Sequence, residues 1–436
     1  MISRLDTKDL GFDQEFAALL LIPEEDRNDV RTSVRKILDE VKAGSDGALL
    51  RLTSTFDHFS VSDISELVVS PERLKAAYEG LDTLVRDALN ESIERVTQYH
   101  EKQLAAFGNG QSWQYIDEWG NKLGQRVTPM QRVGIYAPGG KASYPSTVIM
   151  TAIPARVAGV AEVILCAPAP KGEVNNLLLA AAYRCGVDQV ITIGGAQAIA
   201  AMAYGTETVA RVDKIVGPGN IFVATAKEMV FGDVGIDMIA GPSEVVIVAD
   251  SNADVEWIVL DMFAQAEHDE MAQAILISDS EALLDAVHAA MPAALEAQKR
   301  KKIIQDSIST RGALIKVTDL DEAFEIVNRV APEHLQLAMA EPELHVQKVK
   351  HAGAVFLGMH SAEVVGDYTA GPSHVLPTSG TARFASALGT YDFQTRTSMV
   401  ACSPNGSIKL NRAAAILATE EGLGAHAASA SARARG

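Results

Sequence analysis

Residues 133–167 read VGIYAPGGKASYPSTVIMTAIPARVAGVAEVILCA, and their pattern indicates the fold class. Two short apolar runs, VGIYA and EVILCA, enclose an Ala-rich segment of helical character. Further apolar runs follow, separated by more helical segments: QVITIG at 189–194, KIVG at 214–217 and EVVIVAD at 244–250. Continuous apolar strands that alternate with helices are typical of a parallel sheet covered on both faces. The sequence therefore predicts an α/β fold.

A second set of strands and helices lies downstream: AILIS at 274–278, GALIKV at 312–317, DEAFEIVNRV at 321–330 and AVFLG at 354–358. We therefore predict two incomplete, Rossmann-like parallel-sheet lobes, one inserted in the other, with small terminal extensions. The first α/β domain is expected to comprise residues 31–135 and 245–385, and the inserted domain residues 136–244. Residues 1–30 are expected to form an N-terminal arm, and residues 386–436 a C-terminal segment too short for a core of its own.

Composition narrows the choice of partners. The chain of 436 residues is 47% hydrophobic and 22% charged, as in ordinary globular proteins, and its formal net charge is −18. Nucleic acids and anionic membranes attract basic surfaces, so we expect neither as a partner. The N-terminus lacks a secretory pattern, and no apolar run reaches the length of a membrane span. The three scattered cysteines have no metal or redox spacing, which fits a cytoplasmic location.

Common ligand-binding motifs are missing from the sequence. The nearest approaches to a dinucleotide fingerprint, GIYAPGGK, IGGAQAIA and VGPGNIF, lack its glycine spacing, and no P-loop occurs. Ser243 in AGPSEVV could bind a ligand or cap a turn, but no nucleophile elbow surrounds it. Glycines do follow consecutive predicted strands, where an open α/β sheet places its ligand crevice, although such glycines are usually plain turns.

The stretch VAPEHLQL, residues 330–337, places a carboxylate and an imidazole side by side. If Pro332 begins a helix, the side chains of Glu333 and His334 could both point over the N-terminal end of that helix and act as an acid/base pair. An ordinary helix start would have the same residues, because a carboxylate suits the positive end of the helix dipole. The stretch alone leaves both interpretations open.

Four other residues carry donor atoms that zinc accepts. On a helix, Gln265 and His268 in AQAEH would share a face, although they could equally be ordinary helix residues. Asp367 is expected in a Gly-rich loop after AVFLG, with His374 in the same loop. His426, in EEGLGAH, lies near the chain end where glycines break the helix. Each residue alone would be an ordinary surface residue, but together they offer a mixed nitrogen and oxygen site.

Taken together, these motifs resemble the histidinol dehydrogenase family. The matching stretches are AQAEH at 264–268, VAPEHLQL at 330–337, GDYTAGPSHVLPTSGTARF at 366–384 and EEGLGAH at 420–426. GIYAPGGKASYPSTVIM, IGGAQAIAA, DKIVGPGN and IDMIAGPSEV resemble the same family in the same order. The resemblance runs from about residue 30 to residue 426 and rests on eight separate motifs, so it is specific.

The resemblance implies an NAD-dependent oxidation of L-histidinol to L-histidine through a bound aldehyde. It implies one zinc ion per subunit, held by Gln265, His268, Asp367 and His426, and an acid/base pair of Glu333 and His334. Implied substrate contacts are Ser243, Gln265, His268, His334, Asp367, His374, Glu421 and His426, and implied NAD contacts are Tyr136, Gln197 and Asn220. In this family the C-terminal segment crosses to the other subunit of a homodimer, so Glu421 and His426 would complete the partner's site.

Two rival interpretations remain at this stage. A paralogue of the same fold could oxidise another alcohol, such as a sulfonated diol, and would be expected to carry extra Arg or Lys near His374. That loop matches the histidinol-oxidising form except at Ser373, where the family resemblance leads us to expect Asn. A binding protein with a degenerate site would have lost metal or acid/base positions, and all six are present.

Overall fold

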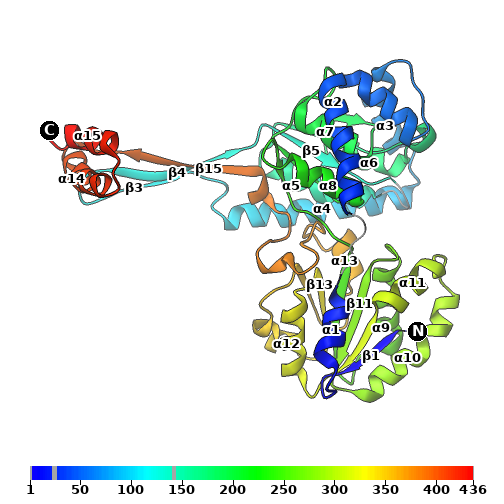
Figure 1. Ribbon diagram of the computed structural model, residues 1–436. Helices are drawn as coiled ribbons and strands as arrows, with labels where there is room; N and C mark the ends of the chain where they lie inside the picture. Colours follow the sequence, from blue (N-terminus) through cyan, green and yellow to red (C-terminus); the bar gives the residue numbers. More distant parts are fainter. Residues whose placement is uncertain (1, 22–26, 140–143, 436) are drawn as a thin grey trace.

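The computed structural model describes residues 2–21, 27–139 and 144–435. It has two α/β lobes, one above the other in Figure 1, and a long arm that projects sideways from the upper lobe. Each lobe has a six-stranded sheet, and a three-stranded antiparallel sheet forms the arm. The predicted α/β class with two largely parallel sheets is confirmed.

Lobe 1, the upper lobe in Figure 1, contains the strands first recognised in the sequence. Its sheet has the order β2 (Val68–Val69), β7 (Gln189–Ile191), β6 (Glu162–Cys166), β5 (Arg132–Tyr136), β8 (Lys214–Val216), β9 (Gly235–Ile236). All pairs are parallel except β2 with β7. The crossover helices are α5 (Pro145–Val157), α6 (Asn176–Arg184), α7 (Gly195–Tyr204) and α8 (Ile221–Val230). The strand order reverses between β5 and β8, where open α/β sheets bind ligands.

Lobe 2 repeats this strand order. Its sheet runs β1 (Ser3–Asp6), β12 (Ala313–Lys316), β11 (Gln273–Ser278), β10 (Glu244–Ala249), β13 (His334–Ala338), β14 (Ala354–Leu357), with parallel pairs throughout. Its helices are α9 (Val255–Ala266), α10 (Glu281–Glu296), α11 (Lys301–Arg311), α12 (Leu320–Val330) and α13 (Glu363–Tyr368). Here the order reverses between β10 and β13, and Glu333 and His334 lie at that reversal.

The N-terminal residues belong to lobe 2, which corrects the expected arm over residues 1–30. Strand β1 pairs with β12 at the sheet edge, and α1 (Phe12–Leu20) buries Phe12 and Phe16 against the same sheet. The unpaired backbone groups at the edge of β12 are thereby satisfied. Residues 1 and 22–26 of the expected arm lie outside the described residues.

Residues 27–106 also pack differently from the predicted division. Helices α2 (Arg27–Phe56), α3 (Pro71–Glu79) and α4 (Thr83–Ala106) lie against α7, α6 and α5 of lobe 1. Apolar residues of α2 such as Val34 and Leu38 join the lobe-1 core. The assignment of this segment to the domain of residues 245–385 was therefore wrong, because these helices complete the helical layers of the other sheet.

The arm consists of two stretches that are far apart in the sequence. Strands β3 (Trp113–Ile116), β4 (Lys122–Pro129) and β15 (Gln394–Ala401) form an antiparallel ribbon, and α14 (Pro404–Glu420) and α15 (Gly424–Arg433) lie at its far end (Figure 1). Residues 113–129 thus share this unit with the C-terminal segment instead of the first domain. All of β3 and nearly all of β15 are exposed, so the ribbon buries almost no core of its own.

Short 3-10 helices complete the described structure at Ile64–Leu67, Pro170–Gly172, Pro342–Leu344, Val346–Lys348, Thr381–Arg383 and Thr390–Phe393. Among the described helices, none has the length and apolar character needed to cross a bilayer.

Candidate active site

The VAPEHLQL stretch starts a strand, not a helix. Helix α12 ends at Val330, and Ala331 caps it in the left-handed conformation, with φ 52°. Pro332 follows this cap, a common position for proline because the ring cannot continue a helix. Strand β13 begins at His334. The prediction that Pro332 begins a helix was therefore wrong. Glu333 and His334 are nevertheless both buried, and His334 Nδ1 lies 3.9 Å from Glu333 Oε2.

Glu333 is held by a second buried carboxylate, Glu244. The amide N–H of Glu244 donates to the Glu333 carboxylate over 2.9 Å, and the amide N–H of Glu333 donates to Glu244 Oε1 over 3.2 Å. The amide of Ser379 also donates to Glu244. Burial raises the pKa of Glu333 well above its usual range, and the nearby charge of Glu244 adds to this effect. Burial also raises the pKa of Glu244 to about 7.

Gln265 connects His334 with a third buried carboxylate, Glu363. Gln265 lies in the last turn of α9, and its side-chain amide is hydrogen-bonded to His334 Nδ1 over 3.1 Å. When the amide nitrogen occupies that position it also donates to Glu363, at 3.2 Å and 3.3 Å, and the amide oxygen is left for another partner. Burial lowers the pKa of His334 to about 4, so its imidazole is neutral at pH 7.

His268, Asp367 and His374 form the adjoining polar cluster. His268 follows the end of α9, and its Nε2 lies 4.0 Å from Asp367 Oδ2. On the other side, His374 Nδ1 lies 3.6 Å from Asp367 Oδ1. Asp367 lies in the short helix α13 and not in the expected loop. Burial alone would raise the pKa of Asp367, but the hydrogen bond from His374 and the histidine charges hold it below its usual range.

The donors of this cluster fit a metal ion such as zinc. His268 Nδ1 faces the carbonyls of Ala264 and Gln265 at 3.1 Å and 3.2 Å, an arrangement that leaves Nε2 as the free donor. Two donors of one tetrahedral zinc ion lie roughly 3.3 Å apart. His268 Nε2 and Asp367 Oδ2, at 4.0 Å, would therefore have to approach each other slightly to share an ion. Within the described ranges, however, no group of three His, Cys, Asp or Glu residues could hold a metal ion.

Two expected site residues lie far from this cluster. Glu421 caps the end of α14 and His426 lies in α15, both at the tip of the arm (Figure 1). Both side chains are exposed. Ser243, in contrast, directly precedes Glu244 at the start of β10 and is half-buried. The single chain thus brings together every expected metal and substrate residue except the two on the arm.

Ser373, where Asn was expected, has a structural role in the loop that carries His374. Its hydroxyl donates to the carbonyl of Met150 in α5 over 3.0 Å and accepts from the amide of Val375 over 3.2 Å. The residue is 3% exposed. Ser373 therefore ties this loop of the site to lobe 1.

The expected NAD contacts lie on the carboxyl edge of the lobe-1 sheet. Tyr136 ends β5, and its hydroxyl accepts from the amide of Gly195 over 3.1 Å. Gln197 is buried in the first turn of α7, and Asn220 caps the N-terminus of α8. The cluster around His334 lies at the amino edge of the lobe-2 sheet, and seven residues, 237–243, join β9 to β10 across the two lobes.

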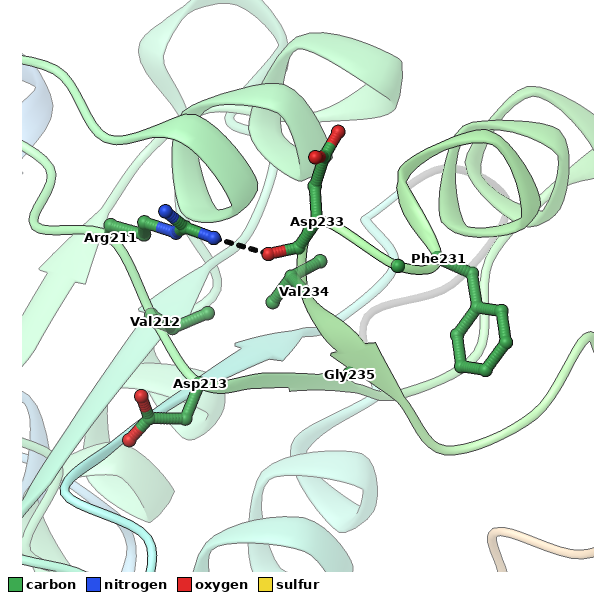
Figure 2. A pocket seen from close by; sticks show the side chains of 8 residues that line it. Arg211, Val212, Asp213, Phe231, Asp233, Val234 and Gly235 are labelled. Carbon is green, nitrogen blue, oxygen red and sulfur yellow. Dashed lines mark hydrogen bonds between the residues drawn. The ribbon is translucent and has the colours of Figure 1, made fainter. Parts of the chain in front are cut away.

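A hollow of about 550 Å³ lies on the opposite edge of lobe 1 (Figure 2). It is lined by residues 211–213, which precede β8, and by residues 231–235, which lead into β9. Arg211 donates a hydrogen bond to the carbonyl of Asp233. Because these are the amino ends of the strands, the hollow is separate from the edge that carries Tyr136 and Asn220.

Similarity to known proteins extends over nearly the whole chain. The family described as histidinol dehydrogenase matches residues 21–434. The chain belongs to the histidinol dehydrogenase family. Histidinol dehydrogenase from Methylococcus capsulatus is 52% identical over 434 residues, covering 100% of this chain and 98% of the relative. That from Pseudomonas syringae pv. tomato is 52% identical, with coverages of 98% and 95%. The crystal structure of histidinol dehydrogenase from Elizabethkingia anophelis has a TM-score of 0.91 and 32% identity, and covers 100% of this chain and 98% of that chain.

Membership of the histidinol dehydrogenase family confirms the resemblance read from the motifs and the assignment of the chain to the oxidoreductases. Two buried residues of this family member, Glu244 and Glu363, were assigned no role from the sequence. Glu363 lies one helical turn before Asp367, so a carboxylate at that spacing was an available signal. For Glu244 no local signal existed, because its hydrogen bonds with Glu333 join strands 89 residues apart.

Proposed function

We propose that the chain oxidises L-histidinol to L-histidine with two NAD molecules, through an aldehyde that stays bound between the two hydride transfers. Family membership supports this assignment. The observation that carries it is the buried pair of Glu333 and His334, joined through Gln265 to the cluster of His268 and Asp367. An alcohol oxidation needs a proton acceptor beside an orienting group, and this arrangement supplies both.

We propose that zinc binds to Gln265, His268 and Asp367, with His426 from a second copy of the chain as a further ligand. When bound, zinc would supply a Lewis acid and a template for the substrate's nitrogens. The amide oxygen of Gln265, the imidazole nitrogens of the histidines and the carboxylate of Asp367 suit the preference of zinc for mixed nitrogen and oxygen ligands. His374, at 3.6 Å from Asp367, orients that carboxylate and lies where it can also contact the substrate.

His334 and Glu333 would divide the proton transfers. His334 is neutral at pH 7 and accepts the hydroxyl proton while hydride moves to the nicotinamide. The aldehyde then takes up a water molecule, and the proton of that water passes to Glu333. Hydride moves to a second NAD, and the acid is formed. Burial raises the pKa of Glu333 well above its usual range, so its carboxylate is a stronger base than an ordinary one.

NAD is proposed to bind at the carboxyl edge of lobe 1, where the strand order reverses. Tyr136 ends β5, Asn220 caps the helix that follows β8, and these two strands flank the reversal. Gln197 lies in the helix after β7. The edge faces lobe 2 through the linker 237–243, which suits hydride transfer between a substrate on one lobe and a cofactor on the other.

We further propose a homodimer in which each arm completes the partner's site. The arm exposes Ile116, Val400, Ile416 and Leu417, each by more than 60%, and large apolar residues in such a group are typical of an interface. An exposed three-stranded ribbon also needs packing against other elements for stability. A cytoplasmic location is proposed as well, because the three cysteines are all free.

The test of the proposed function is the stoichiometry of NADH formation. Purified protein loaded with zinc should produce two NADH for each L-histidinol consumed, with no free aldehyde trapped by a carbonyl reagent. One NADH per substrate would contradict the two-step assignment. Oxidation of a sulfonated diol in place of histidinol would contradict the substrate assignment.

A further inference from the structure

Asp57 lies where dinucleotide-binding sheets place an acidic residue. It directly follows α2, and its carbonyl accepts a hydrogen bond from the amide of Lys171 over 2.9 Å. Lys171 lies in the loop after β6, which is the second strand of the parallel series that starts at β5. In dinucleotide-binding folds a carboxylate near the end of the second strand binds the ribose hydroxyls. Strand β6 ends at Cys166 and is followed by Ala167 and Pro168, and none of these three residues carries a carboxylate.

One carboxylate oxygen of Asp57, Oδ2, is buried and has no hydrogen bond to any described residue. The residue is 9% exposed. Burial raises the pKa of its carboxyl, and the charge of the neighbouring His58 opposes that shift. Thr53, one helical turn earlier, is fully buried, and its hydroxyl likewise has no partner among the described residues. A buried carboxylate or hydroxyl without a hydrogen bond is costly, so such groups normally have a partner in the functional state. A ligand that brings hydroxyl groups would satisfy both atoms.

Asp57 is also close to the proposed NAD edge. Burial raises the pKa of Tyr136 to about 12, and the negative charge of Asp57 contributes to that shift, so the two side chains lie within electrostatic reach. Gly139, which follows β5, and Gly194, which follows β7, both lie against the loop after β6: a Cβ added at either glycine would come within 2.9 Å of Pro168. These two glycines, the loop after β6 and the end of α2 therefore lie together at the carboxyl edge.

We propose that the Asp57 carboxylate binds the 2′- and 3′-hydroxyls of the adenosine ribose of NAD, and that it selects against the 2′-phosphorylated dinucleotide NADP. This inference rests on the proposed use of NAD. A carboxylate accepts hydrogen bonds from a vicinal diol, whereas a 2′-phosphate at the same place would meet a like charge in a buried setting. Strand β6 has no acidic residue at its carboxyl end, and Asp57 at the end of α2 takes the place of that residue.

Equilibrium binding of NAD and NADP, measured by calorimetry without histidinol, tests the inference in two variants, Asp57→Asn and Asp57→Ala. Both should raise the Kd for NAD about tenfold, since a charge-assisted hydrogen bond is lost. The preference for NAD over NADP should fall by about tenfold or more, and the KM for histidinol should stay unchanged. Asp39→Asn is the matched control, because Asp39 lies exposed on the same helix and the substitution removes the same charge.

The outcomes separate this inference from the proposed function. If wild-type protein binds neither dinucleotide, the cofactor assignment and the inference both fail. If wild-type protein binds NAD and both Asp57 variants keep the wild-type preference, the carboxylate has only a structural role or contacts a buried water, and the inference is overturned. Thermal melting verifies that the variants are folded, and Asp57→Asn is expected to melt close to wild type because Oδ2 has no hydrogen bond to lose among the described residues.

Discussion

The exchange of arms between subunits can be tested by mixing two inactive variants. His426→Ala removes a proposed metal ligand at the tip of the arm, and His334→Ala removes the proposed base in lobe 2. Each variant alone should be inactive. In a hybrid dimer, the His334 of one chain and the His426 of the other can meet in one intact site, because the arm carries His426 well away from its own lobes (Figure 1).

The expected recovery follows from the symmetry of the dimer. Random exchange of equal amounts of two variants gives about half hybrid dimers, and each hybrid has one intact site of two, so about 25% of wild-type activity should return. The assay is NADH formation from histidinol after subunits have exchanged under mild denaturant, with exchange followed by mass spectrometry of the intact dimers.

Two results bear on the reasoning directly. A mixture of His426→Ala with Glu421→Ala should stay inactive, since both defects lie on the arm and every site in every hybrid contains one of them. If verified hybrids of His426→Ala and His334→Ala also stay inactive, the sites are not shared and the role proposed for the arm is refuted.

Three other predictions concern the carboxylates and the metal. Glu244 has an ordinary pKa of 4.5 that burial raises to about 7, so the folded protein loses stability as pH rises between these values. The free energy of unfolding of Glu244→Gln, relative to that of wild type, should therefore increase by about 1–3 kcal/mol from pH 5 to pH 8. If the variant and wild type differ in melting temperature by the same amount at pH 5 and at pH 8, the burial of Glu244 is not the cause. Glu333→Gln should release about one NADH per site and then slow by about 10²-fold or more; an unchanged ratio of two NADH per histidinol at wild-type rate would count against its role. Dialysis against a zinc chelator should abolish activity and added zinc should restore it, unless the donors around His268 serve no metal.

The lobes could be predicted because each buried strand carries its own signal. EVILCA and EVVIVAD are apolar apart from charged residues at their ends, as is typical of strands covered on both faces, and they form strands β6 and β10. The partner of a helix is harder to infer. The apolar face of α2 would suit either sheet, and only the folded chain shows that Val34 and Leu38 pack in lobe 1.

Within the site, identities were easier to predict than conformations. Glu333 and His334 were singled out on the assumption that Pro332 starts a helix, whereas the proline follows a left-handed cap and leads into β13. Local sequence does not distinguish these cases, because proline is common at both ends of helices. The reciprocal hydrogen bonds of Glu244 and Glu333 depend on the pairing of β10 with β13, which a local pattern cannot reveal.

The side-chain amide of Gln265 has an oxygen that accepts hydrogen bonds and a nitrogen that donates them, and both have partners to choose from in this site. If its oxygen is drawn to a metal ion, its nitrogen faces His334 and Glu363. Without the ion the amide can turn, and its oxygen then accepts a hydrogen bond from His334 Nδ1. Loss of the proposed metal would therefore alter the hydrogen bonding of the proposed base as well as substrate orientation, although His334 is not itself a proposed metal ligand.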